Sequence, residues 1–306
     1  MDFTDGMRVF VAAAETGSFS GAAARLGMSP KLASKYMAEL EARLGARLFQ
    51  RTTRRLGLTP AGERLMIRAP GWLDDLDEMT GEAREPSRGV VGTLRVSAPV
   101  VFGELFVQQM LHRFAAPHPD LVIDLRLSDR YVDLAAEGID VAIRIGRLDN
   151  SAAIARKLGK STLVLVAAPL YLARSGELAK VDDLHRHACI RDANLRGDGA
   201  WPLTENGELR RVQVSGRFVV DSARVARDLA VSGEGVTLCP DYVVRDDLLA
   251  KRLARVLPNV SGPTLDIHAL HLGQRRVPRR TRALLDFLAK DRFGGFVAGD
   301  LYAPVE

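Results

Sequence analysis

The chain has 306 residues, which is enough for about two domains of ordinary size. Its content of 47% hydrophobic and 26% charged residues is typical of a globular protein, and no run of roughly eighteen apolar residues predicts a membrane-spanning helix. The net charge of +5 permits a polyanionic partner without establishing one. Two cysteines, Cys189 and Cys239, exclude a disulfide scaffold, and the acidic start at Asp2 is unlike a signal peptide. We therefore expect a cytoplasmic protein.

A first helix is predicted near the N-terminus. Phe3, Met7, Phe10, Val11 and Ala14 recur at helical spacing, and Gly17 follows them. The stripe is expected to pack against the next two helices and to carry no chemistry.

Two more helices follow, separated by a tight turn. Ser20 is the expected N-cap of a helix that ends at Leu26 before Gly27. Ser29-Pro30 is expected to cap and start the second helix, which Gly45 ends. Only a few residues lie between the two helices, as a helix-turn-helix requires.

The second of these helices has two distinct faces. The face expected to be buried contains Ala33, Tyr36, Met37, Leu40 and Leu44. The opposite face is small or basic near the N-terminus, which is the end that a recognition helix presents to DNA bases. The expected DNA contacts of this helix are Ser29, Pro30, Lys31, Ser34 and Lys35.

A basic hairpin is predicted next, with apolar residues from Leu48 to Leu58 around a Thr-Thr-Arg-Arg tip. Such a wing would contact phosphates and supply affinity rather than sequence choice. The expected contacts are Arg51, Thr52, Arg54 and Arg55. The alternative is a small helical bundle with a solvated charged loop, which the basic face and the basic hairpin together disfavour.

This segment resembles the LysR-type transcriptional regulator family. The residues that carry the resemblance keep their spacing across the first part of the chain: Phe10, Ala23-Ala24, Leu26, Ser29-Pro30, Leu32, Ser34, Leu40-Glu41, Leu44-Gly45, Leu48-Phe49, Arg51 and Leu58-Thr59-Pro60-Ala61-Gly62. The resemblance implies operator DNA, a small-molecule effector and a second copy of the chain as partners, as a homodimer or homotetramer. RNA polymerase is a candidate further partner.

A long helix is predicted after Thr59-Pro60. Its apolar residues follow a heptad spacing, which is typical of a helix that pairs with a partner: Leu65, Ala69, Trp72, Leu76, Met79 and Ala83. In the family this segment is a dimerising linker helix; the alternative is a helix packed on its own domain. Pro70-Gly71 lies in its middle and is expected to bend or break it near Ala69.

The rest of the chain alternates strands and helices, which indicates a parallel sheet wrapped by helices. The resemblance implies two crossovers joining two lobes, as in periplasmic solute-binding proteins. The expected fold class is thus α/β with an N-terminal all-α winged helix-turn-helix, a long linker helix and a two-lobed effector domain. The expected boundaries are 1–59 for DNA binding, 60–88 for the linker helix and hinge, and 89–295 for effector binding, with lobe I at about 92–162 and 266–292 and lobe II at about 163–265.

An effector is expected at the C-terminal ends of the strands, where α/β units bind ligands. A serine, backbone amides and an apolar surface there would suit a small aromatic or aliphatic acid, and Arg144 or Arg147 could pair with its charge. The candidate residues are Ser97, Val100, Val101, Phe102, Asp129, Ile145, Gly146, Arg147, Asp221 and Ser222.

Other functions have weaker support. The spacing of His185, His187 and Cys189 does not match a zinc site, and no metal or other cofactor is expected. Redox sensing through Cys189 or Cys239 remains an alternative within the same architecture. We expect no catalytic residues, because the chain has no nucleophile elbow and no Gly-x-Gly-x-x-Gly turn. An α/β enzyme and a solute-binding module are remote alternatives.

Overall fold

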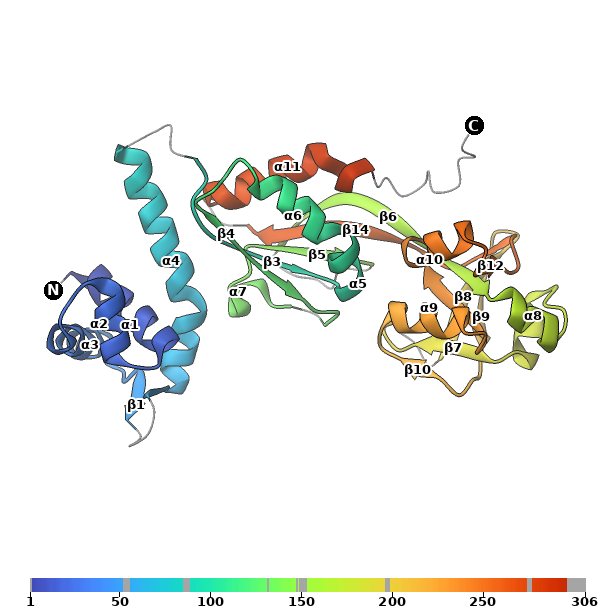
Figure 1. Cartoon of the computed structure of the whole chain (residues 1–306), viewed down its shortest axis with the longest axis horizontal. Helices are drawn as coiled ribbons and strands as arrows, with labels where there is room; N and C mark the ends of the chain where they lie inside the picture. The colour runs from blue at the N-terminus through green and yellow to red at the C-terminus, as the bar shows by residue number, and fades with distance from the viewer. Residues whose placement is uncertain are drawn as a thin grey trace.

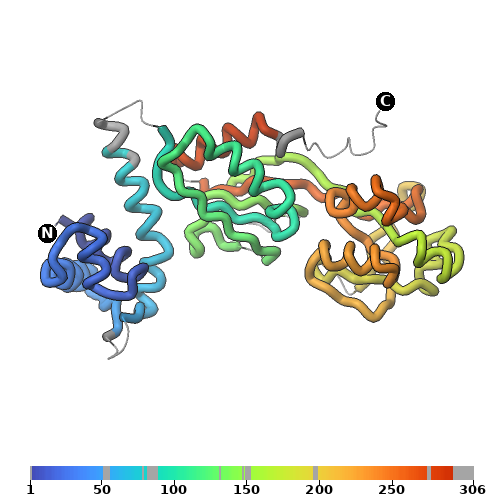
Figure 2. Tube along the Cα trace, viewed as in Figure 1, coloured from blue at the N-terminus to red at the C-terminus, as the bar shows by residue number. Residues whose placement is uncertain are grey.

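The computed structural model describes residues 2–51, 56–84, 89–130, 132–146, 148, 153–195, 199–273 and 277–295. Three bodies lie in a row: an N-terminal helical domain, a first α/β lobe and a second α/β lobe, with one long helix between the helical domain and the first lobe (Figure 1, Figure 2). This arrangement confirms the fold class expected from the sequence. Within the described residues, no helix is long and apolar enough to cross a membrane.

The N-terminal domain is a winged helix-turn-helix. Its elements are α1 (Phe3–Thr16), α2 (Phe19–Leu26), α3 (Pro30–Leu44), β1 (Phe49–Arg51) and β2 (Leu56–Leu58). Phe10, Ala33 and Leu40 are fully buried in its core, together with Leu48 at the base of the hairpin. Burial of these side chains gives the helix stripes seen in the sequence their partners.

Helix ends were mostly placed correctly from local chemistry. Gly17, Gly27 and Gly45 end their helices in the left-handed conformation that favours glycine. Two predictions were wrong. The N-cap of α2 is Ser18, whose hydroxyl accepts a hydrogen bond from the Gly21 amide at 2.9 Å, because the helix begins one turn earlier than Ser20 implied. Leu44 is 41% exposed, because the last turn of α3 extends beyond the core.

The linker helix α4 (Pro60–Arg84) is continuous across Pro70, so the expected break near Ala69 is wrong. Proline inside a helix removes one hydrogen bond and costs about 3 kcal/mol. Packing on both sides of the proline offsets this cost: Ala69 and Leu73 are buried in the core of the N-terminal domain, and Asp77 pairs with Arg8 of α1. Helical stability in proteins comes mainly from such tertiary packing.

The two lobes share one nine-stranded sheet in the order β10-β7-β11-β6-β14-β5-β3-β4, with β12 pairing with β6. The strands of this sheet are β3 (Gly92–Ala98), β4 (Leu121–Leu127), β5 (Val141–Ile145), β6 (Ala153–Ala167), β7 (Cys189–Asp192), β10 (Val219–Val220), β11 (Val236–Pro240), β12 (Ala254–Arg255) and β14 (Thr264–Leu272). A small sheet in lobe II holds β8 (Ala200–Glu205), β9 (Glu208–Gln213) and β13 (Val260–Ser261).

Helices cover both lobes (Figure 1). They are α5 (Val100–Phe102), the π-helical η1 (Gly103–Val107), α6 (Gln108–Ala115), α7 (Leu134–Glu137), α8 (Pro169–Ser175), the 3-10 helix η2 (Val181–Arg186), α9 (Ala223–Val231), α10 (Asp241–Leu249) and α11 (Arg279–Gly295). The sequence indicated a parallel sheet, and within each lobe it is partly parallel: β3 pairs with β4 and β5, and β7 with β10 and β11. The long strands β6 and β14 run antiparallel and connect the lobes.

Each lobe has its own hydrophobic core. One core contains Leu94, Val96, Ile143 and Leu284, and the other contains Leu163, Leu184, Ile190 and Leu238. The division between them falls along β6 and β14, the strands expected to cross between lobes. Residues 85–88, most of the predicted hinge, lie outside the described residues.

Candidate DNA-binding and effector-binding sites

Helix α3 presents its N-terminal half to solvent. Ser29 caps it by accepting a hydrogen bond from the Leu32 amide at 3.2 Å, and Pro30 occupies its first turn. Lys31 and Lys35 are exposed and Ser34 is partly buried, whereas the opposite face packs into the core. The only ion pair of Lys35 among the described residues is with Glu39 at 3.8 Å, one turn along the helix. The arrangement provides an accessible basic face of the kind that enters a major groove.

The wing is fixed in place beside this helix. Glu41 of α3 accepts hydrogen bonds from the amides of Leu48 and Phe49, at 2.7 and 3.2 Å. On the other side, Thr59 donates to the Arg47 carbonyl at 2.7 Å and accepts from the Gly62 amide at 3.1 Å. A Cβ on Gly62 would lie 2.1 Å from the Leu48 carbonyl oxygen, so only glycine permits this approach of α4 to the wing.

The tip of the wing falls outside the described residues. Arg51 ends β1 and pairs in register with Leu56, but its side chain is not described. Thr52, Arg54 and Arg55, the other expected phosphate contacts, lie in the undescribed tip.

In lobe I, the structure brings Ser97 together with Arg144. Ser97 is 1% exposed at the end of β3, and its hydroxyl accepts a hydrogen bond from Arg144 Nη2 at 2.8 Å. Burial lowers the pKa of the Arg144 guanidinium, while the Asp129 carboxylate raises it. No carboxylate of the described chain lies within ion-pairing distance of Arg144. A partly buried cation without a paired anion is a suitable group to bind the charge of an acid.

The predicted apolar surface and amide site at Val100–Phe102 are already filled by the protein. The Val100 amide donates to Asp129 Oδ1 at 3.1 Å, so this donor is engaged by an internal carboxylate. Phe102 is fully buried and its ring packs edge-on against Tyr242 of α10, with centroids 5.3 Å apart. Val101 is 6% exposed and belongs to the core of lobe II. In this conformation Val101 and Phe102 join the lobes rather than face an effector, which corrects the expectation from sequence.

Three carboxylates from the two lobes influence one another at the facing strand ends. Burial raises the pKa of Asp192 at the end of β7, and the carboxylates of Asp129 and Asp221 raise it further. Asp192 also accepts a hydrogen bond from the Asn194 amide at 2.9 Å, and the Asn194 side chain donates to the Asp221 carbonyl at 2.6 Å. Asp192 is missing from the sequence-based candidates because its strand was not recognised. The strand-end rule applied to Cys189–Asp192 would have found it.

The remaining candidates occupy neighbouring positions. Ile145 ends β5 and is half-buried against the lobe I core, and the Gly146 amide donates to the Asp266 carbonyl at 2.9 Å. Ser222 occupies the N-cap position of α9 without a side-chain capping bond. Arg147 lies outside the described residues.

Both thiols are poorly suited to redox chemistry. Cys189 and Cys239 are each 1% exposed. Burial raises the pKa of the Cys189 thiol to about 12 and also raises that of Cys239. Reactive cysteines need an accessible thiolate with a lowered pKa. The structure therefore argues against the redox alternative.

The histidines near Cys189 have a structural role. His187 is buried, and its Nδ1 lies 3.1 Å from the hydroxyl of Tyr171, which also accepts from the Ala188 amide at 2.9 Å. Within the described residues, no three His, Cys, Asp or Glu side chains are grouped so that they could hold a metal ion.

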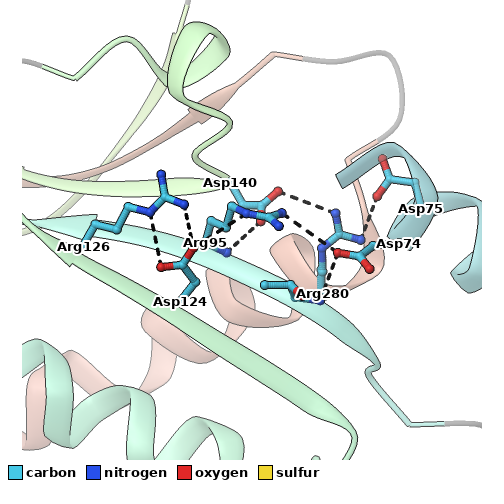
Figure 3. A network of polar contacts seen from close by, with 8 residues as sticks. Asp74, Asp75, Arg95, Asp124, Arg126, Asp140 and Arg280 are labelled. Atoms are coloured by element: carbon cyan, nitrogen blue, oxygen red, sulfur yellow. Dashed lines mark hydrogen bonds and ion pairs between the residues drawn. The ribbon is translucent and has the colours of Figure 1, made fainter. Parts of the chain in front are cut away.

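An ion-pair network joins the linker helix to lobe I (Figure 3). Arg280 of α11 is 1% exposed and lies 2.7 Å from Asp75 of α4 and 3.7 Å from Asp140, which precedes β5. Asp74 of α4 accepts a hydrogen bond from the Thr93 amide at 3.2 Å and lies 4.0 Å from Arg95 of β3. We refer to Asp74, Asp75, Arg95, Asp140 and Arg280 as the linker–lobe network.

Burial sets the electrostatics of this network. Burial raises the pKa of both Asp74 and Asp140, and the arginines only partly counteract the shift. Burial lowers the pKa of Arg280, but Asp140 and Asp75 outweigh that effect and leave the pKa raised. The acid-rich stretch after Trp72 was noted in the sequence as a charge asymmetry, but its partners could not be identified because they are distant in the chain.

Comparison with known proteins agrees with this architecture. Residues 4–63 match the family model described as "Bacterial regulatory helix-turn-helix protein, lysR family", and residues 87–292 match the model described as "LysR substrate binding domain". A curated relative, the HTH-type transcriptional regulator PtxR of Pseudomonas aeruginosa, is 34% identical over 279 residues, covering 91% of this chain and 89% of PtxR.

Solved full-length structures are similar along nearly the whole chain. The virulence activator AphB of Vibrio cholerae, described as a member of the LTTR family, is 31% identical with a TM-score of 0.61, covering 93% of this chain and 98% of AphB. CrgA of Neisseria meningitidis, described as a LysR-type transcriptional regulator, is 29% identical with a TM-score of 0.61, covering 94% of this chain and 98% of CrgA. The chain therefore belongs to the LysR family of transcriptional regulators, with a DNA-binding helix-turn-helix domain and an effector-binding domain.

Proposed function

We propose that this regulator binds operator DNA as a homo-oligomer and responds to a small organic-acid or aromatic effector held between its two lobes. The observation that supports DNA binding most directly is the exposed basic half of α3, opposite a face that is buried in the core and beside a wing that Glu41 and Thr59 hold in place. Lys31, Ser34 and Lys35 are the proposed contacts to base edges and nearby phosphates. Arg51, Thr52, Arg54 and Arg55 are the proposed phosphate contacts of the wing.

The test is a gel shift with Lys35→Ala and the matched control Lys290→Ala, which removes an exposed cation from α11. We expect Lys35→Ala to weaken operator binding by about 1–3 kcal/mol, since losing a groove contact has this effect. Lys290→Ala is expected to bind like the parent protein. Equal affinity of Lys35→Ala and the parent protein, with both folded by circular dichroism, would refute the assignment of α3 as the recognition helix.

Oligomerisation is proposed to use the third face of α4. One face of the helix packs on the N-terminal domain through Ala69 and Leu73, and another lies against lobe I through Asp74 and Asp75. Trp72 and Met79, which belong to the predicted heptad seam, remain 41% and 48% exposed. The first part of the seam is thus used within the chain, and the later part is left for a second copy.

A charge on this face tests the dimer. Met79→Glu is expected to shift the full-length protein toward monomer in sedimentation velocity and to weaken operator binding. Leu249→Glu, which adds the same charge at a 71% exposed leucine of lobe II, is the control. An unchanged sedimentation coefficient for Met79→Glu would remove α4 from the interface. Whether the assembly continues to a tetramer, or contacts RNA polymerase, stays a prediction.

The effector proposal rests on Arg144 and Ser97 in lobe I and on the carboxylates that face them. Arg144 supplies a cation for a carboxylate, and Asp129, Asp192 and Asp221 supply acceptors for a hydroxyl or amino group of the same molecule. A small acid carrying such a donor would satisfy both sides at once. Ile145, Gly146, Arg147 and Ser222 lie close along the chain to these groups and complete the proposed site.

Thermal-shift screening of hydroxylated and amino-substituted carboxylic acids tests the proposal. A hit should raise Tm in the parent protein and in the control Lys160→Gln, but not in Arg144→Gln. Stabilisation by amines without a carboxylate, retained in Arg144→Gln, would instead identify a cationic effector bound by the acidic group.

A further inference from the structure

A second cavity lies away from the proposed effector site, at the joint between α4 and lobe I. It has a volume of about 330 Å³, which is within the range of small-molecule sites. Its lining residues come from α4, from the strand and helix ends of lobe I and from the start of α11: the ones used below are Arg68, Trp72, Ile139, Pro278 and Thr281.

The charge of the lining favours an anion. Three arginines and two aspartates line the cavity. Arg95 and Arg280 are paired with acids of the linker–lobe network. Arg68 is exposed on α4, and no ion pair joins it to a described residue. The surplus positive charge is therefore that of Arg68, which is available for a single negative charge.

A buried hydroxyl gives an independent indication of a ligand. Thr281 lines the cavity and is 3% exposed, and its Oγ1 has no hydrogen-bond partner among the described residues. A buried polar atom without a partner costs about 1–3 kcal/mol, and native proteins rarely leave one unsatisfied. A polar atom of a bound molecule would satisfy it.

The remaining lining is mostly apolar. Trp72 and Ile67 of α4 face the cavity together with Ile139, Leu272 and Pro278 of lobe I. An aromatic or aliphatic body can pack between these side chains while its charged end reaches Arg68. We propose that this cavity, the joint site, binds a small monocarboxylate with an apolar body, through Arg68 and Thr281.

Binding there would reach both neighbouring domains. Trp72 lines the joint site and also contacts Phe3 of α1, with the rings edge-to-face and centroids 6.0 Å apart. Arg280 lines the same cavity and pairs with Asp75 of α4. The joint site is therefore adjacent to the contacts that hold the linker helix on the N-terminal domain and on lobe I.

Fluorescence of Trp72 provides a local readout. The chain has two tryptophans, and Trp201 is buried in lobe II, so Trp201→Phe leaves Trp72 as the only one. Full-length Trp201→Phe is titrated with benzoate and with benzyl alcohol, its uncharged counterpart. Benzoate is expected to produce a saturable change in emission, and benzyl alcohol to bind at least tenfold more weakly. The same titration of Trp72→Phe is expected to show no such change.

Variants then locate the binding. Arg68→Gln is expected to raise the Kd for benzoate at least tenfold, and Arg64→Gln, an exposed arginine one turn earlier on α4, to leave it within twofold. Thr281→Val is expected to raise the Kd severalfold, with recovery in Thr281→Ser.

Other outcomes overturn the proposal. If Arg144→Gln abolishes the signal and Arg68→Gln does not, benzoate binds at the proposed effector site alone, so the joint site fails while the proposed function stands. If benzoate gives no saturable change, the joint site does not take this class of ligand. If Arg68→Gln instead lowers the oligomeric state and no probe binds, a second copy of the chain fills the cavity.

Discussion

Arg280 is expected to be the most sensitive residue of the linker–lobe network. It is 1% exposed and pairs with Asp140, whose side chain is 16% exposed, and with Asp75, which is 42% exposed. Arg280→Met keeps the length of the side chain but leaves Asp140 as a buried charge that has lost its cation. Removing one partner of a buried pair costs about 3–5 kcal/mol. Because Asp75 is open to water, we expect a loss near the lower end, about 3 kcal/mol.

The deficit should depend on pH, with a definite sign. Burial raises the pKa of Asp140, so the folded state binds its proton more tightly than the unfolded state does. For such an acid, stability increases as pH falls through the folded-state pKa, because protonation removes the buried charge. In Arg280→Met the nearby cation is gone, and the pKa of Asp140 rises further. The gap in stability between the parent protein and Arg280→Met should therefore narrow between about pH 7 and about pH 5.

Differential scanning calorimetry of the full-length protein measures this effect. For a domain of 150–250 residues a loss of about 3 kcal/mol lowers Tm by roughly 6–12 °C. Arg282→Met, an exposed arginine two residues along the same helix, is the control and should change stability by less than about 0.5 kcal/mol. Adding Asp140→Asn to Arg280→Met should recover part of the loss. A loss below about 1 kcal/mol, or additive effects in the double variant, would show that the pair behaves like a solvated surface ion pair.

Three further predictions concern single residues. Ser18→Ala should destabilise the N-terminal domain by about 1 kcal/mol, since the Gly21 amide loses its cap, and an unchanged unfolding midpoint would contradict this cap. Pro70→Ala should stabilise α4 by up to about 3 kcal/mol, because it restores a helix hydrogen bond, and a lower Tm would mean that the proline ring packs favourably. Cys189 and Cys239 should react with a thiol reagent at neutral pH only after unfolding, and rapid labelling of the native protein would revive the redox alternative.

Features set by local chemistry could be predicted from the sequence. Ser29, Pro30 and Gly45 bound α3 as expected, because each acts on backbone groups only a few residues away. The alternating face of the same helix followed from helical spacing alone. Pro70 was misjudged for the opposite reason: its local cost is offset by packing between segments that are distant in the sequence.

Features set by distant contacts could not. The first part of β6 was missed because Ala153–Lys160 carries exposed, charged side chains, and only its pairing with β14 makes it a strand. Asp75, Asp140 and Arg280 come from three separate elements, so their pairing depends on the tertiary fold. The surface at Val101 and Phe102 was misjudged because residues at a strand end can be covered by a second lobe, here through Tyr242.

The contacts of α4 constrain how an effector signal could reach DNA. The helix is held on the N-terminal domain through Ala69 and Asp77, and on lobe I through Asp75 and Arg280. While both sets of contacts hold, the recognition helix moves with lobe I as one body, and a change in the lobes alters operator binding by changing how two copies are arranged. Moving α4 against lobe I instead requires opening the linker–lobe network. If this costs about 3 kcal/mol, an effector must prefer the opened state by on the order of a hundredfold in affinity to drive the change.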